Sequence, residues 1–145
     1  MSGLRQISIV ALIVSWIVDI VGTNVIALLY FMWGAATGRV DPAKLTDQRA
    51  PMADPDVFLT LMLVGTAVSV AAGYLAARMA GRAPLLHGVL SSVGGIAAGL
   101  LTLQTTLEST PLGLVLAGFA AGPIAGVAGG YVELRHARIR ARSAG

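Results

Sequence analysis

The stretch QISIVALIVSWIVDIVGTNVIALLYFMW (Gln6–Trp33) contains 28 residues and a single charged side chain, that of Asp19. About 20 apolar residues suffice for a helix to cross the hydrocarbon core of a bilayer. Because lipid offers the backbone no hydrogen-bond partners, such a stretch crosses as a helix. It is also much longer than the apolar part of a signal peptide, which has about 7–15 residues. We therefore predict a retained membrane helix.

The rest of the chain has the same character. The sequence has 145 residues, of which 56% are hydrophobic and only 12% charged, whereas a soluble domain averages about 25% charged residues. Three more apolar segments reach the spanning length, at Val57–Met79, Pro84–Thr105 and Pro111–Leu134. We predict an all-α fold with a single membrane domain: an integral bundle of four transmembrane helices, with an outer loop at 34–56 and a basic tail at 135–145.

Basic residues are distributed unevenly over the ends and connections of these segments. The first loop holds Arg39, Lys44 and Arg49. It also holds the acidic residues Asp41, Asp47, Asp54 and Asp56. The N-terminus, the second connection and the C-terminal tail hold the larger basic group: Arg5, Arg78, Arg82, Arg135, Arg138, Arg140 and Arg142. Because cytoplasmic segments are enriched in Lys and Arg, we predict that both termini are cytoplasmic. We expect the tail to touch anionic lipid rather than nucleic acid.

Local signals predict where the helices begin and end. Asp54 before Pro55 is typical of a helix start, since the carboxylate caps free N–H groups and proline fits the first turn. Gly81 can end the second helix and Pro84 can start the third. Pro111 can start the fourth in the same way, and Pro123 is expected to kink it.

Two segments of the chain resemble each other. VAAGYLAAR (Val70–Arg78) and VAGGYVELR (Val127–Arg135) share five identical positions at one offset. This indicates two related helix hairpins, as in a parallel repeat. The alternative is convergence, because every helix that ends at the cytoplasmic face favours an aromatic residue followed by arginine.

Small residues recur every four positions along three of the predicted helices. Such spacing lets helix backbones approach closely. It does not distinguish packing within the chain from packing against a second copy or another membrane subunit, so we expect a homo-oligomer or a larger complex. The residues are Gly65, Ser69 and Gly73 on the second helix, Gly95 and Gly99 on the third, and Gly118, Gly122, Gly126 and Gly130 on the fourth.

Asp19 lies near the centre of the first helix, where a carboxylate costs about 2.5–3.5 kcal/mol on insertion scales. Helical spacing places it on one face with small and polar residues, so we expect it to point into the bundle. No Lys or Arg lies at its depth, and hydroxyl groups are the expected partners. The candidate proton or cation site comprises Asp19, Thr23, Thr66, Ser69 and Ser91, with Ser92 as a further partner.

No other residues form a recognisable reactive group. The sequence lacks cysteine, and we find no nucleophile with its base, no paired carboxylates and no metal-ligand cluster. His87 at the start of the third helix is expected to bond the hairpin backbone; the alternative is a role in proton uptake. We predict that the protein is not an enzyme and has no cofactor or metal.

Two resemblances add to this interpretation. GYLAARMAGRAPLLHGVL (Gly73–Leu90) resembles a hairpin of small four-helix bacterial inner-membrane proteins without an assigned activity. That resemblance implies a bacterial inner-membrane location. DIVGTNVI (Asp19–Ile26) resembles the first helix of small multidrug-resistance exporters, in which Asp19 would be the exchange carboxylate. The long first loop and the glycine pattern of the fourth helix depart from those exporters.

Two functions therefore remain open. The first is a packing or accessory protein, self-associated or bound to a larger membrane complex. The alternative is a small proton- or cation-coupled transporter or channel centred on Asp19. A water-accessible cavity that reaches Asp19 would favour the second, and a dry, hydroxyl-lined pocket the first.

Overall fold

The computed structural model describes residues 7–40 and 54–143, and these residues form helices and turns without a strand. The helices are α1 (Ile9–Ala36), α3 (Pro55–Ala80), α4 (Pro84–Leu101), α5 (Leu103–Ser109) and α6 (Leu112–Ser143). All except α5 are long and apolar enough to cross a bilayer. The predicted all-α bundle of four membrane-spanning helices is confirmed, and the chain is a multi-pass membrane protein.

The predicted ends of the second helix and the start of the third are confirmed in atomic detail. The Asp54 carboxylate accepts a hydrogen bond from the backbone N–H of Asp56 at 2.9 Å, and Pro55 is the first residue of α3. Gly81 ends α3 in the left-handed conformation, with φ of 63°. Because a residue without Cβ adopts that conformation freely, α3 stops there and α4 begins at Pro84.

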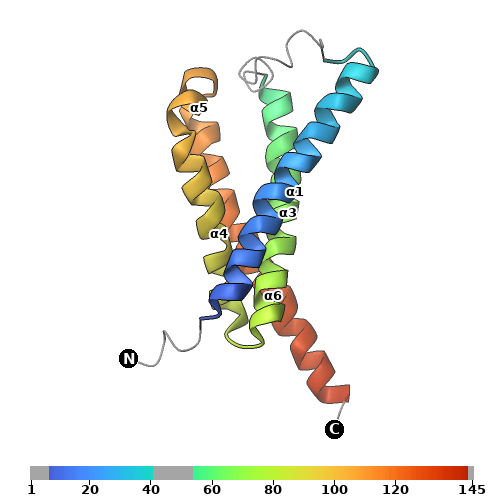
Figure 1. Ribbon diagram of the computed structural model, residues 1–145, viewed down its shortest axis with the longest axis vertical. Coiled ribbons are helices and arrows are strands. Elements are labelled where there is room, and N and C mark those ends of the chain that lie inside the picture. The colour runs from blue at the N-terminus through green and yellow to red at the C-terminus, as the bar shows by residue number, and fades with distance from the viewer. Residues whose placement is uncertain (1–6, 41–53, 144–145) are drawn as a thin grey trace.

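The helices form two pairs that diverge toward one end of the molecule. In Figure 1, α1 and α3 separate toward the upper end from α4, α5 and the N-terminal part of α6. The first turn of α1 and the last turns of α6 lie at the lower end, together with the turn between α3 and α4. We call these the α5 end and the turn end of the bundle.

At the turn end, glycines bring three helices into close contact. A Cβ atom built on Gly126 would lie 2.2 Å from the carbonyl oxygen of Gly88, and one on Gly73 would lie 2.7 Å from that of Gly126. A Cβ on Gly130 would lie 2.6 Å from the carbonyl oxygen of Pro84. Any side chain at these positions would force α3, α4 and α6 apart.

The predicted glycine pattern differs from these contacts in two respects. Gly118 has open space beside it, and Gly65 and Gly122 meet their neighbours only at ordinary contact distance. Gly129, which does not follow the four-residue spacing, is closest of all to α3: a Cβ there would lie 2.2 Å from the carbonyl oxygen of Val70. Gly118 therefore packs against no other helix within the described residues, and its predicted packing against a second copy or another subunit stays a prediction.

The third predicted helix, at 84–105, is interrupted in the structure. α4 ends at Leu101 and a separate short helix, α5, follows from Leu103. At the break, the Thr102 hydroxyl donates to the carbonyl oxygen of Gly99 at 3.2 Å. A threonine hydroxyl competes in this way with regular backbone bonding, and such competition bends or ends helices.

The fourth helix extends much further than predicted. α6 continues to Ser143, so residues 135–143 of the basic tail are helical. Arg5, Lys44, Arg49, Asp41 and Asp47, which entered the prediction of orientation, lie outside the described residues. Of the predicted first loop at 34–56, the structure describes residues 34–40 and 54–56.

The suggested repeat of two helix hairpins is not matched by a two-fold arrangement. A two-fold axis along the membrane normal would exchange α1 with α4 and α3 with α6. α3 packs extensively against α4, but α1 and α6 have no comparable contact within the described residues. The likeness of the two segments is therefore local, on the helices that run toward the turn end.

Candidate functional site

Asp19 lies inside the bundle, as its helical face predicted. Ser15, one turn earlier on α1, is completely buried, and Asp19 itself is only 7% exposed. The Ser69 hydroxyl of α3 donates a hydrogen bond to Asp19 Oδ1 at 2.7 Å. Of the hydroxyl groups that the sequence offered as partners, Ser69 is therefore the one that bonds the carboxyl group.

The second carboxyl oxygen of Asp19 faces α4. A Cβ atom built on Gly95 would lie 3.1 Å from Asp19 Oδ2. That distance is tighter than an ordinary van der Waals contact, so a side chain at residue 95 would press on the carboxyl group. Gly95 thus leaves room for the carboxyl group between α1, α3 and α4.

A cavity of about 350 Å³ begins at this carboxyl group. It runs between the two helix pairs from Asp19, Ser69 and Ser92 toward the α5 end, where Phe58, Thr102 and Thr106 line it. Phe58 and Ser69 are eleven residues apart on α3, which corresponds to about 16 Å along a helix. The cavity therefore connects the middle of the membrane-spanning bundle with its α5 end.

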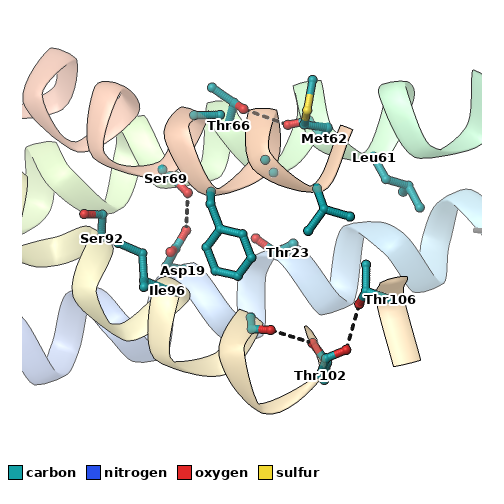
Figure 2. Close-up of a pocket in the computed structure, with 18 of the residues that line it drawn as sticks. Asp19, Thr23, Leu61, Met62, Thr66, Ser69, Ser92, Ile96, Thr102 and Thr106 are labelled. Atoms are coloured by element: carbon teal, nitrogen blue, oxygen red, sulfur yellow. Dashed lines mark hydrogen bonds between the residues drawn. The ribbon is translucent and has the colours of Figure 1, made fainter. Parts of the chain in front are cut away.

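The walls of the cavity are mostly apolar, with hydroxyl groups at intervals. Leu61, Met62, Ile96 and Phe119 are among the lining residues. Figure 2 shows Asp19 and Ser69 pointing toward each other at one end and Thr102 and Thr106 at the other. This composition suits a small, largely apolar molecule with one polar group.

Of the remaining predicted site residues, some line the cavity with Asp19 and Ser91 does not. Thr23 and Thr66 line the cavity together with Asp19. The Thr66 hydroxyl is bonded to its own helix, at the carbonyl oxygen of Met62 (2.7 Å). Ser91 lies outside the cavity: it donates to the carbonyl oxygen of Gly88 at 2.6 Å and packs beside Gly126. The structure thus does not bring Ser91 together with Asp19, because its position on α4 faces α6.

Beyond Asp19, toward the turn end, hydrogen bonds tie α1 to α4. The Trp16 indole N–H donates to the carbonyl oxygen of Leu90 at 3.1 Å. The backbone N–H of Ser8 donates to His87 Nε2 at 2.9 Å, and His87 Nδ1 lies 3.1 Å from the carbonyl oxygen of Ala83. Since Nε2 accepts, Nδ1 carries the proton, and His87 is neutral in this arrangement. The expectation that His87 bonds the hairpin backbone is confirmed.

A second buried acid was missed by the sequence reasoning. Glu133 on α6 is 5% exposed at the turn end and forms an ion pair with Arg140. Its Oε2 atom has no partner among the described residues. The signal that could have found it is its spacing: Glu133 lies seven residues after Gly126, two helical turns along the same buried face.

Comparisons with protein-family models, with curated proteins and with solved structures found no match to this chain.

Proposed function

We propose that the protein is a small membrane transporter in which Asp19 exchanges a proton or a cation at the base of the cavity. The observation that supports this proposal most directly is the cavity itself, which reaches a buried carboxyl group from one end of the bundle. A carboxyl group in a packed helix interface has no need of such a space. A carboxyl group that binds a ligand needs a space beside it that the ligand can enter.

The surroundings of Asp19 suit a carboxyl group that exchanges a proton for a cation. In an apolar environment a carboxyl group favours its protonated form, whereas a cation beside it favours the ionised form. Within the described residues, no Lys or Arg lines the cavity to neutralise it. Proton and cationic ligand would therefore compete for the same group, and the Ser69 hydroxyl can bond either form.

The helix arrangement fits access from one side at a time. The two helix pairs diverge at the α5 end (Figure 1). Close glycine contacts join α3, α4 and α6 at the turn end. Alternating access requires that one end opens as the other closes. In this account the α5 end is the open one in the structure, and the α1–α4 hydrogen bonds belong to the closed end.

Proton movement in liposomes tests the proposal. Purified protein is reconstituted with a pH-sensitive dye inside, and a panel of small quaternary ammonium ions, which carry a permanent charge and do not cross a protein-free bilayer, is added outside. A transported solute should change the internal pH with the wild type, and Asp19→Asn, which folds but cannot titrate, should abolish the change. A solute-dependent pH change that persists in Asp19→Asn would contradict the proposal.

The second candidate is the packing or accessory role. It is supported by the close glycine contacts of α3, α4 and α6, which account for much of the bundle without reference to a ligand. In the liposome experiment this role predicts no pH change with any solute. Purification from native membranes, with identification of the proteins that co-purify, would then identify the complex.

A further inference from the structure

Asn24 on α1 is a polar side chain that points away from the bundle. It is exposed, and its Nδ2 group donates to the carbonyl oxygen of Ile20, one turn earlier, at 2.7 Å. This is the one hydrogen bond of its side chain among the described residues. One amide hydrogen and the amide oxygen therefore face outward.

The depth of Asn24 makes this exposure costly. The midpoint of α1 lies between residues 22 and 23, so Asn24 is about 2 Å from it along the axis. At that depth the surroundings are hydrocarbon, which offers an amide no partner. A side chain that carries an unmet donor and an unmet acceptor in lipid is stabilised by a partner that supplies both.

The residues around Asn24 form a continuous apolar seam. They follow one another at spacings of three and four, the pattern of helices that pack side by side in a left-handed pair. From its first to its last member the seam spans about 27 Å, close to the thickness of the hydrocarbon core. The seam comprises Val10, Ile13, Ile17, Ile20, Asn24 and Leu28, and its apolar members are all exposed.

We propose that this seam pairs α1 with α1 of a second copy of the chain, with the two Asn24 amides bonded to each other across the dimer axis. An amide carries a donor and an acceptor on one group, so two identical amides satisfy each other reciprocally. Copies inserted in the same orientation bring Asn24 to the same depth. A single asparagine in an apolar seam fixes both partner number and register in this way.

The proposed dimer contact does not involve the candidate site. Asp19 and Asn24 are five residues apart, which places them about 140° apart around the helix. The Asp19 face packs inside the bundle and the Asn24 face lies outside it. The inference is therefore independent of the proposed transport function.

Disulfide crosslinking of single-cysteine variants tests the seam, since the natural chain has no cysteine. Leu28 and Leu29 are neighbours with nearly equal exposure, 60% and 56%, but only Leu28 lies on the seam. In liposomes that contain the purified protein alone, we expect Leu28→Cys to form a crosslinked dimer on oxidation and Leu29→Cys to remain monomeric. Equal yields at both positions, or a monomer in both cases, would overturn the proposal.

A second measurement tests the role of the amide. Fluorescently labelled protein is diluted with lipid, and energy transfer gives the dissociation constant of the dimer. We expect Asn24→Ala to weaken the dimer roughly 5- to 30-fold, the effect of removing an interhelical hydrogen-bonded pair. Val25→Ala, a matched truncation off the seam, should leave it unchanged. If Asn24→Ala dimerises as strongly as the wild type, the pairing of the two amides is overturned. If the wild type is monomeric at every dilution, the α1–α1 dimer is overturned, and the seam faces lipid or another protein.

Discussion

The Ser69 hydroxyl donates to Asp19 Oδ1 at 2.7 Å and so joins α3 to α1 at the base of the cavity. Three other candidate hydroxyls donate instead to carbonyl oxygens of their own helices: those of Thr66, Ser91 and Ser92. Those groups are satisfied locally and contribute little to helix association. The Asp19–Ser69 bond is therefore the polar contact that fixes how the two helices face each other at this depth.

Removing that bond should destabilise the fold. We expect Ser69→Ala to lower the free energy of unfolding by about 1–3 kcal/mol, because the buried Asp19 carboxyl group loses its donor. The measurement is thermal unfolding of the purified protein in detergent. Thr66→Val is the matched control on the same helix, and its effect should be smaller. Equal effects of the two substitutions would mean that the Asp19–Ser69 bond adds nothing to stability.

The glycine contacts at the turn end make a sharper prediction than the spacing of the glycines alone. Gly126→Ala places a methyl group against the backbone of Gly88 and should cost about 1–3 kcal/mol through overpacking. Gly118→Ala adds the same methyl group in open space on the same helix, and should be neutral or slightly stabilising because alanine favours helix. The larger substitution Gly126→Leu should prevent the bundle from closing. If Gly126→Ala unfolds at the wild-type temperature, α4 and α6 are not in backbone contact.

The turn between α3 and α4 contains a residue in a costly conformation. Ala83 has φ of 44°, in the left-handed region, where a Cβ atom costs roughly 1–2 kcal/mol. We expect Ala83→Gly to raise the free energy of unfolding by up to about 1 kcal/mol, after the greater flexibility of glycine in the unfolded chain is included. Gly81→Ala, at φ of 63°, should lower it by a similar amount. Denaturant or thermal unfolding of both variants checks the pair, and a shift of the two in the same direction would contradict it.

His87 should matter for stability although it does not line the cavity. It is completely buried, and His87→Phe would leave the backbone N–H of Ser8 without its acceptor and remove one of the hydrogen bonds that tie α1 to α4. We expect a loss of about 1–3 kcal/mol in thermal unfolding. His136→Phe is the control, because His136 is exposed and its ring contact with Tyr74 suits either side chain. A stable His87→Phe variant would show that the Ser8 bond is dispensable.

The sequence predicted the helices well because the signals involved are local. Hydropathy sets the spans, and Asp54, Gly81 and Pro84 act within one turn of their own positions. The inward direction of Asp19 followed from the period of a single helix. The partner of Asp19 did not, because it depends on the rotation of α3 about its own axis, which is set by packing over the whole interface.

Two other features needed the three-dimensional arrangement. The extension of α6 through residues 135–143 was missed because a run of arginines was interpreted as charge, although arginine is a strong helix former and Arg140 pairs with Glu133 two turns earlier. The open space beside Gly118 could not be predicted because a four-residue spacing marks one face of a helix, and along that face the neighbour changes from α4 backbone to open cavity.

Chemical modification measures whether a reagent can reach Asp19 through the cavity. A small apolar carbodiimide adds to protonated carboxyl groups, and mass spectrometry of the purified protein counts and locates the adducts. Gly118 and Gly113 both have open space beside them on α6, but only Gly118 lines the cavity. We predict one adduct at Asp19 in the wild type and in Gly113→Leu, and a strongly slowed reaction in Gly118→Leu, in which leucine fills the cavity. An Asp19 that stays unmodified in the wild type, or reacts equally in both leucine variants, would contradict the account of a cavity that delivers a solute to this carboxyl group.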